Sequence, residues 1–142
     1  MKSKSIGYVT GHNFGGWKIP QKIQTAVMHF NANKNNILLD FMITEYMDSE
    51  KNNILIKTLY KNFEVKNIFF TSALQIREIN NNTSKILNNY NLYFFLENIV
   101  IKKNSGLLNL KKYLMLISNR KQNIFHRKGY LDIFSDYKKS FK

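Results

Sequence analysis

GYVTGHNFGGWKIPQKIQ, residues 7–24, joins a short apolar strand to a helix through a polar loop that contains three glycines. Ile6 and Tyr8 supply apolar strand positions. Pro20 suits the start of the helix, because its ring fixes φ and an N–H is not needed there. In open α/β sheets, the loops at the carboxyl ends of strands face the ligand. Residues 7–24 therefore predict an α/β fold and mark the sheet edge where a ligand would bind.

The rest of the chain continues this alternation. Strands are expected over residues 6–10, 37–43, 65–72 and 92–100, and helices over 20–33, 52–62 and 82–90. The run at 37–43, ILLDFMI, is typical of a strand covered on both faces. Ile23, Val27 and Phe30 recur at helical spacing and predict the buried face of the first helix. The pattern predicts a small parallel sheet of about four strands with flanking helices, in three layers.

The C-terminal part of the chain differs in composition. We expect the α/β domain to occupy residues 1–103, followed at 104–142 by a helix over 107–117 and a basic aromatic tail. Residues 100–142 hold eleven Lys or Arg against two Asp or Glu. This asymmetry suits an anionic partner, such as an acidic membrane surface in peripheral contact, or a solvated tail. The five aromatic residues between 125 and 141 favour packing on the domain itself or on a partner subunit, as in a homodimer.

The net charge of +13 raises the question of nucleic acid. We do not expect such a partner, because only three of the 22 cationic residues are arginine, the side chain best suited to phosphate and base recognition. Abundant Lys, Asn, Ile, Phe and Tyr instead fit an AT-rich genome. Without cysteine, a long apolar run or a secretory leader, the chain is expected in the cytoplasm. No phosphate-loop, dinucleotide or metal motif occurs, so no cofactor or metal is expected.

Polar side chains gather where the predicted strands end. His12, Glu45 and Glu97 are the candidate catalytic groups, as a general base or anion ligand and as an acid–base pair. Glu97 could instead satisfy a buried neighbour, and His12 could be a solvated loop residue. The candidate substrate-binding residues are Tyr8, Thr10, Phe14, Trp17, Gln21, Gln24, Tyr46, Ser72 and Asn98. For Tyr8, Tyr46 and Trp17 the alternative is packing, with the polar atom hydrogen-bonded.

The motifs at 7–24, Glu45-Tyr46, Thr71-Ser72 and Leu96–Val100 resemble those of the sporadic carbohydrate cluster proteins. This resemblance covers about residues 6–103. It implies a role in the biosynthesis of bacterial surface polysaccharides such as O-antigen or capsule, with no assigned reaction. The chain has Gly11-His12 where the family pattern has a Ser-Arg pair, so His12 would have to take the place of that arginine.

A weaker resemblance is to the catalytic domain of serine recombinases, which also begin with a Gly-Tyr strand, a polar loop and a glutamine-bearing helix. It implies a resolvase-like or flavodoxin-like architecture. The recombinase Tyr-x-Arg-x-Ser motif would fall on Tyr8, Thr10 and His12, so both the arginine and the nucleophilic serine are missing.

Three functions follow as hypotheses. The first is a protein that acts on or binds a nucleotide-sugar or sugar-phosphate intermediate of surface-glycan synthesis. The second is a non-catalytic accessory protein that docks a glycosyltransferase or the membrane surface. The third is a recombinase-like DNA binder without chemistry.

Overall fold

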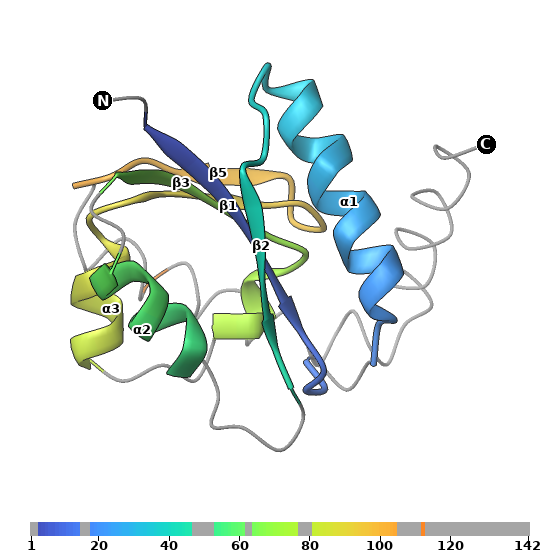
Figure 1. Ribbon diagram of the computed structural model, residues 1–142, viewed down its shortest axis with the longest axis horizontal. Helices are drawn as coiled ribbons and strands as arrows, with labels where there is room; N and C mark the ends of the chain where they lie inside the picture. Colours follow the sequence, from blue (N-terminus) through green and yellow to red (C-terminus); the bar gives the residue numbers. More distant parts are fainter. Residues whose placement is uncertain are drawn as a thin grey trace.

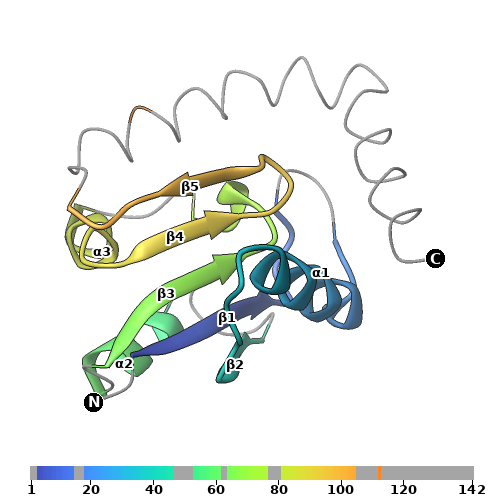
Figure 2. The same cartoon turned by 90° about the horizontal axis from the view of Figure 1, so that it is seen from above.

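The computed structural model describes residues 3–14, 18–46, 53–61, 64–76, 81–104 and 112. In this part of the chain five strands form one sheet: β1 (Lys4–Thr10), β2 (Phe41–Glu45), β3 (Val65–Phe70), β4 (Asn91–Phe94) and β5 (Ile99–Ile101). Their order is β2-β1-β3-β4-β5. The first four strands are parallel and β5 runs antiparallel to β4, which Figure 2 shows by the reversed arrow of β5. The α/β fold class predicted from the alternation is therefore confirmed.

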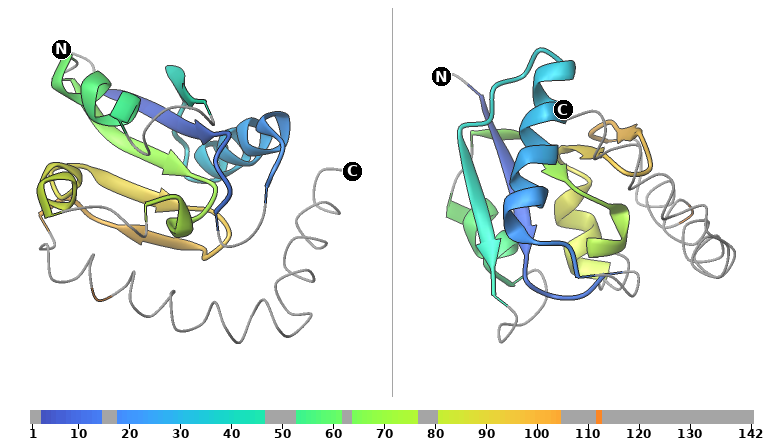
Figure 3. Two further views of the ribbon diagram at one scale, coloured as in Figure 1. Left: turned by 90° about the horizontal axis from the view of Figure 1, so that it is seen from below. Right: turned by 90° about the vertical axis from the view of Figure 1, so that its right-hand side faces the viewer.

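Helices cover both faces of the sheet. Helix α1 (Gln21–Lys34) lies on one side, and α2 (Asn53–Lys61) and α3 (Asn81–Leu87) lie on the other (Figure 1). A short 3₁₀ helix, η1 (Ala73–Ile76), follows β3 after a loop of two residues (Figure 3). This is the three-layer arrangement that parallel sheets require, because both of their faces are apolar.

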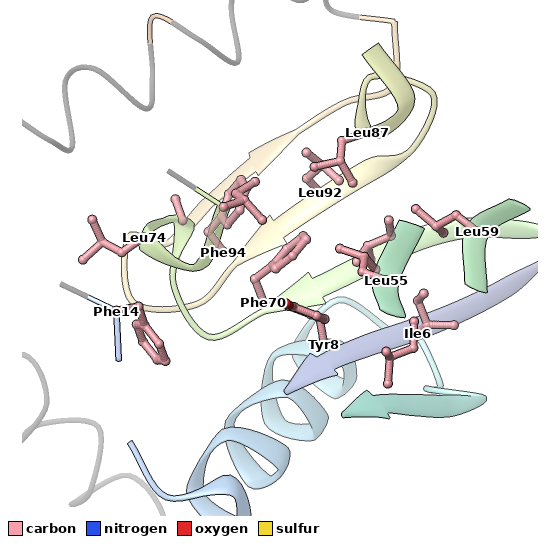
Figure 4. Packing of buried hydrophobic residues seen from close by; sticks show 14 of the residues in the cluster. Ile6, Tyr8, Phe14, Leu55, Leu59, Phe70, Leu74, Leu87, Leu92 and Phe94 are labelled. Carbon is pink, nitrogen blue, oxygen red and sulfur yellow. The ribbon is translucent and has the colours of Figure 1, made fainter. Parts of the chain in front are cut away.

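The larger part of the core lies between the sheet and the α2–α3–η1 layer. Tyr8, Phe70 and Phe94, from three adjacent strands, form a row of rings, with centroids 5.7 Å and 5.3 Å apart (Figure 4). Leu55 of α2 and Leu87 of α3 are fully buried against this face. A smaller cluster under α1 joins the following residues of the opposite face: Val9, Met28, Ala32, Leu39, Phe69 and Tyr93.

Helix α1 begins and ends at residues with suitable backbone chemistry. Pro20 is the N-cap, and its carbonyl accepts hydrogen bonds from the amides of Ile23 and Gln24, both at 3.0 Å. At the other end Asn36 adopts φ 58°, a left-handed conformation that asparagine tolerates. The next amide, Ile37 N–H, donates a hydrogen bond to Ala32 O at 2.8 Å. The predicted start at Pro20 is thus one residue early.

A row of polar side chains crosses the sheet nearer the amino ends of the strands. Asn67 donates to Ser5 Oγ at 3.0 Å, and Asn91 donates to Asn67 Oδ1 at 3.0 Å. The row is extended on one side by Ser5 N–H, which donates to Asp40 Oδ2 at 2.7 Å, and on the other by Lys103 N–H, which donates to Asn91 Oδ1 at 2.9 Å. These bonds join β1, β3 and β4 to each other, and they join β1 and β4 to residues that flank the edge strands β2 and β5.

Three expectations about individual elements were wrong in detail. The run 92–100 is not one strand but the hairpin β4–β5, because Asn98 takes a left-handed conformation at φ 54° and reverses the chain. The second strand begins at Phe41 rather than 37, and it is an edge strand. In α1 the buried face includes Gln24 and Met28, whereas Phe30 is 37% exposed.

Two further expectations concern residues outside the described ones. The first is the predicted helix over 107–117, of which only Lys112 is described, and it is helical. The second is the aromatic tail, which lies wholly outside the described residues. Within the described residues, no helix is long and apolar enough to cross a membrane.

Candidate binding site

The order of the strands places a topological switch point between β1 and β3. After β1 the chain passes to β2 on one side, and after β2 it returns to β3 on the other side. In open α/β sheets, ligands bind beyond the carboxyl ends of the two strands that flank such a point. Here those ends carry residues 10–12 and residues 71–72, which together we call the switch-point edge.

The loop after β1 is held by Gln24 of α1. Gln24 is fully buried, and its amide pairs with both backbone groups of Thr10: Thr10 N–H donates to Oε1 at 3.1 Å, and Nε2 donates to Thr10 O at 2.7 Å. The same Nε2 donates to Ile19 O at 2.8 Å. One side chain thereby fixes both ends of the segment from Thr10 to Ile19. Within it, His12 N–H donates to Thr10 Oγ1 at 3.0 Å.

The loop after β3 is held by Gln75 and Glu97. Gln75 Oε1 accepts the amides of Thr71 and Ser72 at 2.9 Å and 3.2 Å. Glu97, from the β4–β5 turn, accepts Ser72 Oγ–H at 2.6 Å and Ala73 N–H at 2.9 Å. Burial raises the pKa of the Glu97 carboxyl above its ordinary value of 4.5, although the hydrogen bonds from Ser72 and Ala73 lower it. Glu97 therefore supports the loop through Ser72.

Two buried polar atoms at this edge have no hydrogen-bond partner among the described residues. Within the described part of the chain, His12 Nε2 and Thr71 Oγ1 are the buried side-chain nitrogen and oxygen atoms that make no hydrogen bond. Thr71 is 1% exposed. Unsatisfied buried polar atoms are rare in native proteins because each loses hydration without compensation. Both atoms follow the two strands that flank the switch point, at the edge where open α/β sheets bind ligands.

Glu45 lies at the same edge but points into the protein. It is fully buried, and it accepts Tyr8 Oη–H at 2.8 Å and Ile54 N–H at 2.6 Å. Its carboxylate thus joins β1 to the first turn of α2. Its neighbour Tyr46 is 62% exposed. The predicted pair Glu45-Tyr46 is therefore split, with one member in the core and the other at the surface.

The remaining predicted site residues lie in different surroundings. Phe14 is buried in the core, in the same cluster as Leu74 (Figure 4). Gln21 is exposed in the first turn of α1. Asn98 is exposed in the β4–β5 turn and accepts Lys34 Nζ–H at 3.3 Å. Trp17 lies outside the described residues. The structure thus joins Thr10, Gln24, Ser72 and Glu97 in one network, and His12 is attached through Thr10.

Sequence reasoning did not include Gln75 or Thr71 among the site residues. Thr71 stood at the predicted strand end, but a threonine there gave no sign that its hydroxyl would be buried and unpaired. The position of Gln75 depends on η1, a single turn with no signal in hydrophobic periodicity.

The cations near the edge were also not among the predicted site residues. Lys18 and Lys22 flank the start of α1 and are exposed, and neither forms an ion pair within the described residues.

No group of three or more His, Asp or Glu in the described ranges could hold a metal ion. No protein-family model matches the chain, and no curated protein matches it either.

Solved structures do match. The N-terminal catalytic domain of TP901-1 integrase superposes with a TM-score of 0.57 at 14% identity, covering 86% of this chain and 98% of that one. A resolvase family site-specific recombinase from Streptococcus pneumoniae superposes with a TM-score of 0.56 at 13% identity, covering 99% and 100%. The chain has a resolvase-like fold. At these identities the likeness concerns the fold of the resolvase-like domain and not its activity.

Proposed function

We propose that this resolvase-like domain binds a sugar phosphate or nucleotide sugar at its switch-point edge and serves bacterial surface-carbohydrate biosynthesis. The proposal rests on one observation above all. The buried side-chain polar atoms that lack a partner within the described ranges, His12 Nε2 and Thr71 Oγ1, follow the two strands that flank the switch point. A ligand with hydroxyl or phosphate oxygens offers both donors and acceptors to such atoms.

The charge around the edge favours an anionic ligand. Lys18 lies on the segment from Thr10 to Ile19 whose ends Gln24 holds, Lys22 lies in the first turn of α1, and both are exposed. The carboxylates of Glu45 and Glu97 are each engaged in internal hydrogen bonds with backbone and hydroxyl donors. Cations at the rim and carboxylates turned inward leave a positive potential for a phosphate.

The same contacts favour binding over acid–base chemistry. Glu45 links Tyr8 to α2, and Glu97 links the β4–β5 turn to Ser72 and Ala73. A general acid or base must reach the reacting atom, and these carboxylates are occupied in holding the loops. The surface-carbohydrate pathway is supported by the resemblance of residues 6–103 to the carbohydrate cluster proteins.

The test is a thermal-shift titration with glucose 1-phosphate, uridine diphosphate glucose and inorganic phosphate. A ligand at a hundred times its Kd adds about 2.7 kcal/mol to the free energy of unfolding. We expect His12→Ala and Thr71→Val to lose this shift, and His29→Ala, an exposed histidine on α1, to keep it. Thr71→Val in the free protein should be as stable as wild type or more so, because it removes an unpaired buried hydroxyl.

Two outcomes would contradict the proposal. One is the absence of a shift with all three compounds, which would favour the accessory role in which the protein docks a glycosyltransferase or the membrane. The other is an unaltered shift in both site variants, which would move the ligand elsewhere.

A second candidate function is DNA binding without strand transfer. It is favoured by the likeness to two recombinases and by the net charge of +13. Thr10 and His12 stand at the predicted motif positions, and neither is a serine or an arginine, so cleavage is not proposed. Binding of a 20-base-pair duplex whose affinity falls steeply between 50 and 200 mM salt would support this candidate.

A further inference from the structure

Two glutamines meet behind the switch-point edge. Gln75 Nε2 donates to Gln24 Oε1 at 3.3 Å, between residues 51 positions apart in the sequence. Both side chains are buried, at 7% and 0% exposure. Gln24 holds the loop after β1 and Gln75 holds the loop after β3, so this bond is a side-chain link between the two loops.

The direction of the link is set by the backbone. Gln24 must place its oxygen toward Thr10 N–H and its nitrogen toward the carbonyls of Thr10 and Ile19. Gln75 must place its oxygen toward the amides of Thr71 and Ser72, which leaves its nitrogen as the donor to Gln24. Rotating either side-chain amide by half a turn would place its N–H donors against other N–H donors. The pair therefore has one satisfied arrangement.

Each glutamine binds next to one of the unpaired atoms. Gln75 accepts the amide of Thr71 itself, and Gln24 accepts the amide of Thr10, whose hydroxyl in turn accepts His12 N–H. The bond between the glutamines therefore lies on the chain of hydrogen bonds that connects Thr71 to His12.

We propose that Gln24 and Gln75 are positioning residues that couple the two loops of the switch-point edge and set its affinity for an anionic ligand. The statement about affinity rests on the proposed function, whereas the coupling of the loops does not. A ligand that contacts both loops gains affinity when their spacing is fixed in advance, because less ordering is needed on binding.

The decisive variant is Gln75→Glu. It keeps an oxygen for the amides of Thr71 and Ser72 but replaces the donor with a carboxylate oxygen facing Gln24 Oε1. Gln75→Ala removes the bridging amide without adding charge and serves as a second variant should the first not fold. Asn89→Asp, at an exposed asparagine just before the amino end of β4, is the matched control for the added charge.

The first readout uses the free protein. Amide hydrogen exchange followed by NMR should show the protection of Thr10 N–H falling by about tenfold in Gln75→Glu, equivalent to about 1.4 kcal/mol of opening free energy. Thr10 lies on the opposite loop, so local damage around Gln75 alone would not reach it. Protection of Phe69 in the core should be unchanged, and Asn89→Asp should match wild type throughout. Unchanged protection of Thr10 in both Gln75 variants would overturn the coupling.

The second readout is the affinity for glucose 1-phosphate measured by NMR titration. We expect Gln75→Glu to weaken it by about tenfold, and the combination with Thr71→Val to weaken it less than the product of the two single effects, because both act on the same contact. Independent, multiplicative effects would contradict a positioning role. If wild type does not bind glucose 1-phosphate, the proposed function and the statement about affinity fail, while the exchange data still decide whether the glutamines couple the loops.

Discussion

The phenol of Tyr8 on β1 donates a hydrogen bond to Glu45 Oε2 at the end of β2, across 2.8 Å of the protein interior. The other carboxylate oxygen accepts the amides of Ile54 and Leu55 at 2.6 Å and 3.4 Å, at the start of α2. A carboxylate near the first turn of a helix satisfies amides that have no partner within the helix. This relationship ties a strand, its neighbour and a helix together, so it holds the fold and leaves the switch-point edge to other residues.

Tyr8→Phe is expected to lower the free energy of unfolding by about 1–3 kcal/mol, because it withdraws a donor from a buried carboxylate. Urea denaturation measures the change. Tyr46→Phe, at a tyrosine that is 62% exposed, is the control and should stay within about 0.5 kcal/mol of wild type. Equal effects of the two substitutions would show that the phenol of Tyr8 has no special structural role.

Glu97 should make stability depend on pH in a predictable direction. Burial raises the pKa of its carboxyl above 4.5, so the folded state binds the proton more tightly than the unfolded state. The stability contributed by Glu97 is therefore largest below pH 4.5 and declines as the pH rises through the raised pKa.

The difference in unfolding free energy, wild type minus Glu97→Gln, should accordingly fall as the pH rises above 4.5 and then level off. Urea denaturation at half-unit pH intervals gives the curve. Glu64→Gln, at a carboxylate that pairs with Lys4 on the surface at 3.6 Å, controls for the loss of one negative charge. A difference that rises with pH would have the opposite sign and refute the assignment.

Gly7 is required by a close approach under α1. A Cβ added at Gly7 would lie 2.5 Å from Met42 Sδ and 3.2 Å from Met28 Sδ. Gly7→Ala is expected to cost about 1–3 kcal/mol, toward the lower value because the end of Met42 can move. Adding Met42→Ala should recover part of this cost in a double-mutant cycle by urea denaturation. Strict additivity of the two changes would contradict the steric explanation.

The polar row across the sheet should contribute measurably to stability. Asn67→Ala removes the donor to Ser5 Oγ and the acceptor of Asn91, both inside the protein. We expect a loss of about 1–3 kcal/mol in the free energy of unfolding, measured by urea denaturation. Asn89→Ala, at an exposed asparagine after α3, should change little. A loss no greater than that of Asn89→Ala would mean that water replaces the missing bonds.

Sequence reasoning located the edge of the sheet more accurately than the roles of its residues. Thr10, Ser72, Gln24 and Glu97 were all expected there, and they do share one network. The direction in which each side chain points could not be predicted, because it depends on the neighbours that the fold supplies. Glu45 and Tyr46 are adjacent in sequence, yet one is buried and the other exposed. The C-terminal tail and Trp17 lie outside the described residues, and the predictions for them stay predictions.

The sequence alone predicted three features: the alternation of strand and helix, the proline before α1 and the polar strand ends. Each follows from hydrophobic periodicity or from backbone preferences, which act over a few residues. These were enough for the α/β class and for the position of the polar edge of the sheet. The tertiary structure decided the reversal at Asn98 into a fifth strand, the burial of Glu45 beneath α2, and the meeting of Gln24 with Gln75. Each of these depends on a contact between distant segments or on a turn that no local pattern encodes. The pairing of buried polar groups across the chain, more than their presence in it, distinguishes the residues that hold the loops from those whose polar atoms have no partner among the described residues.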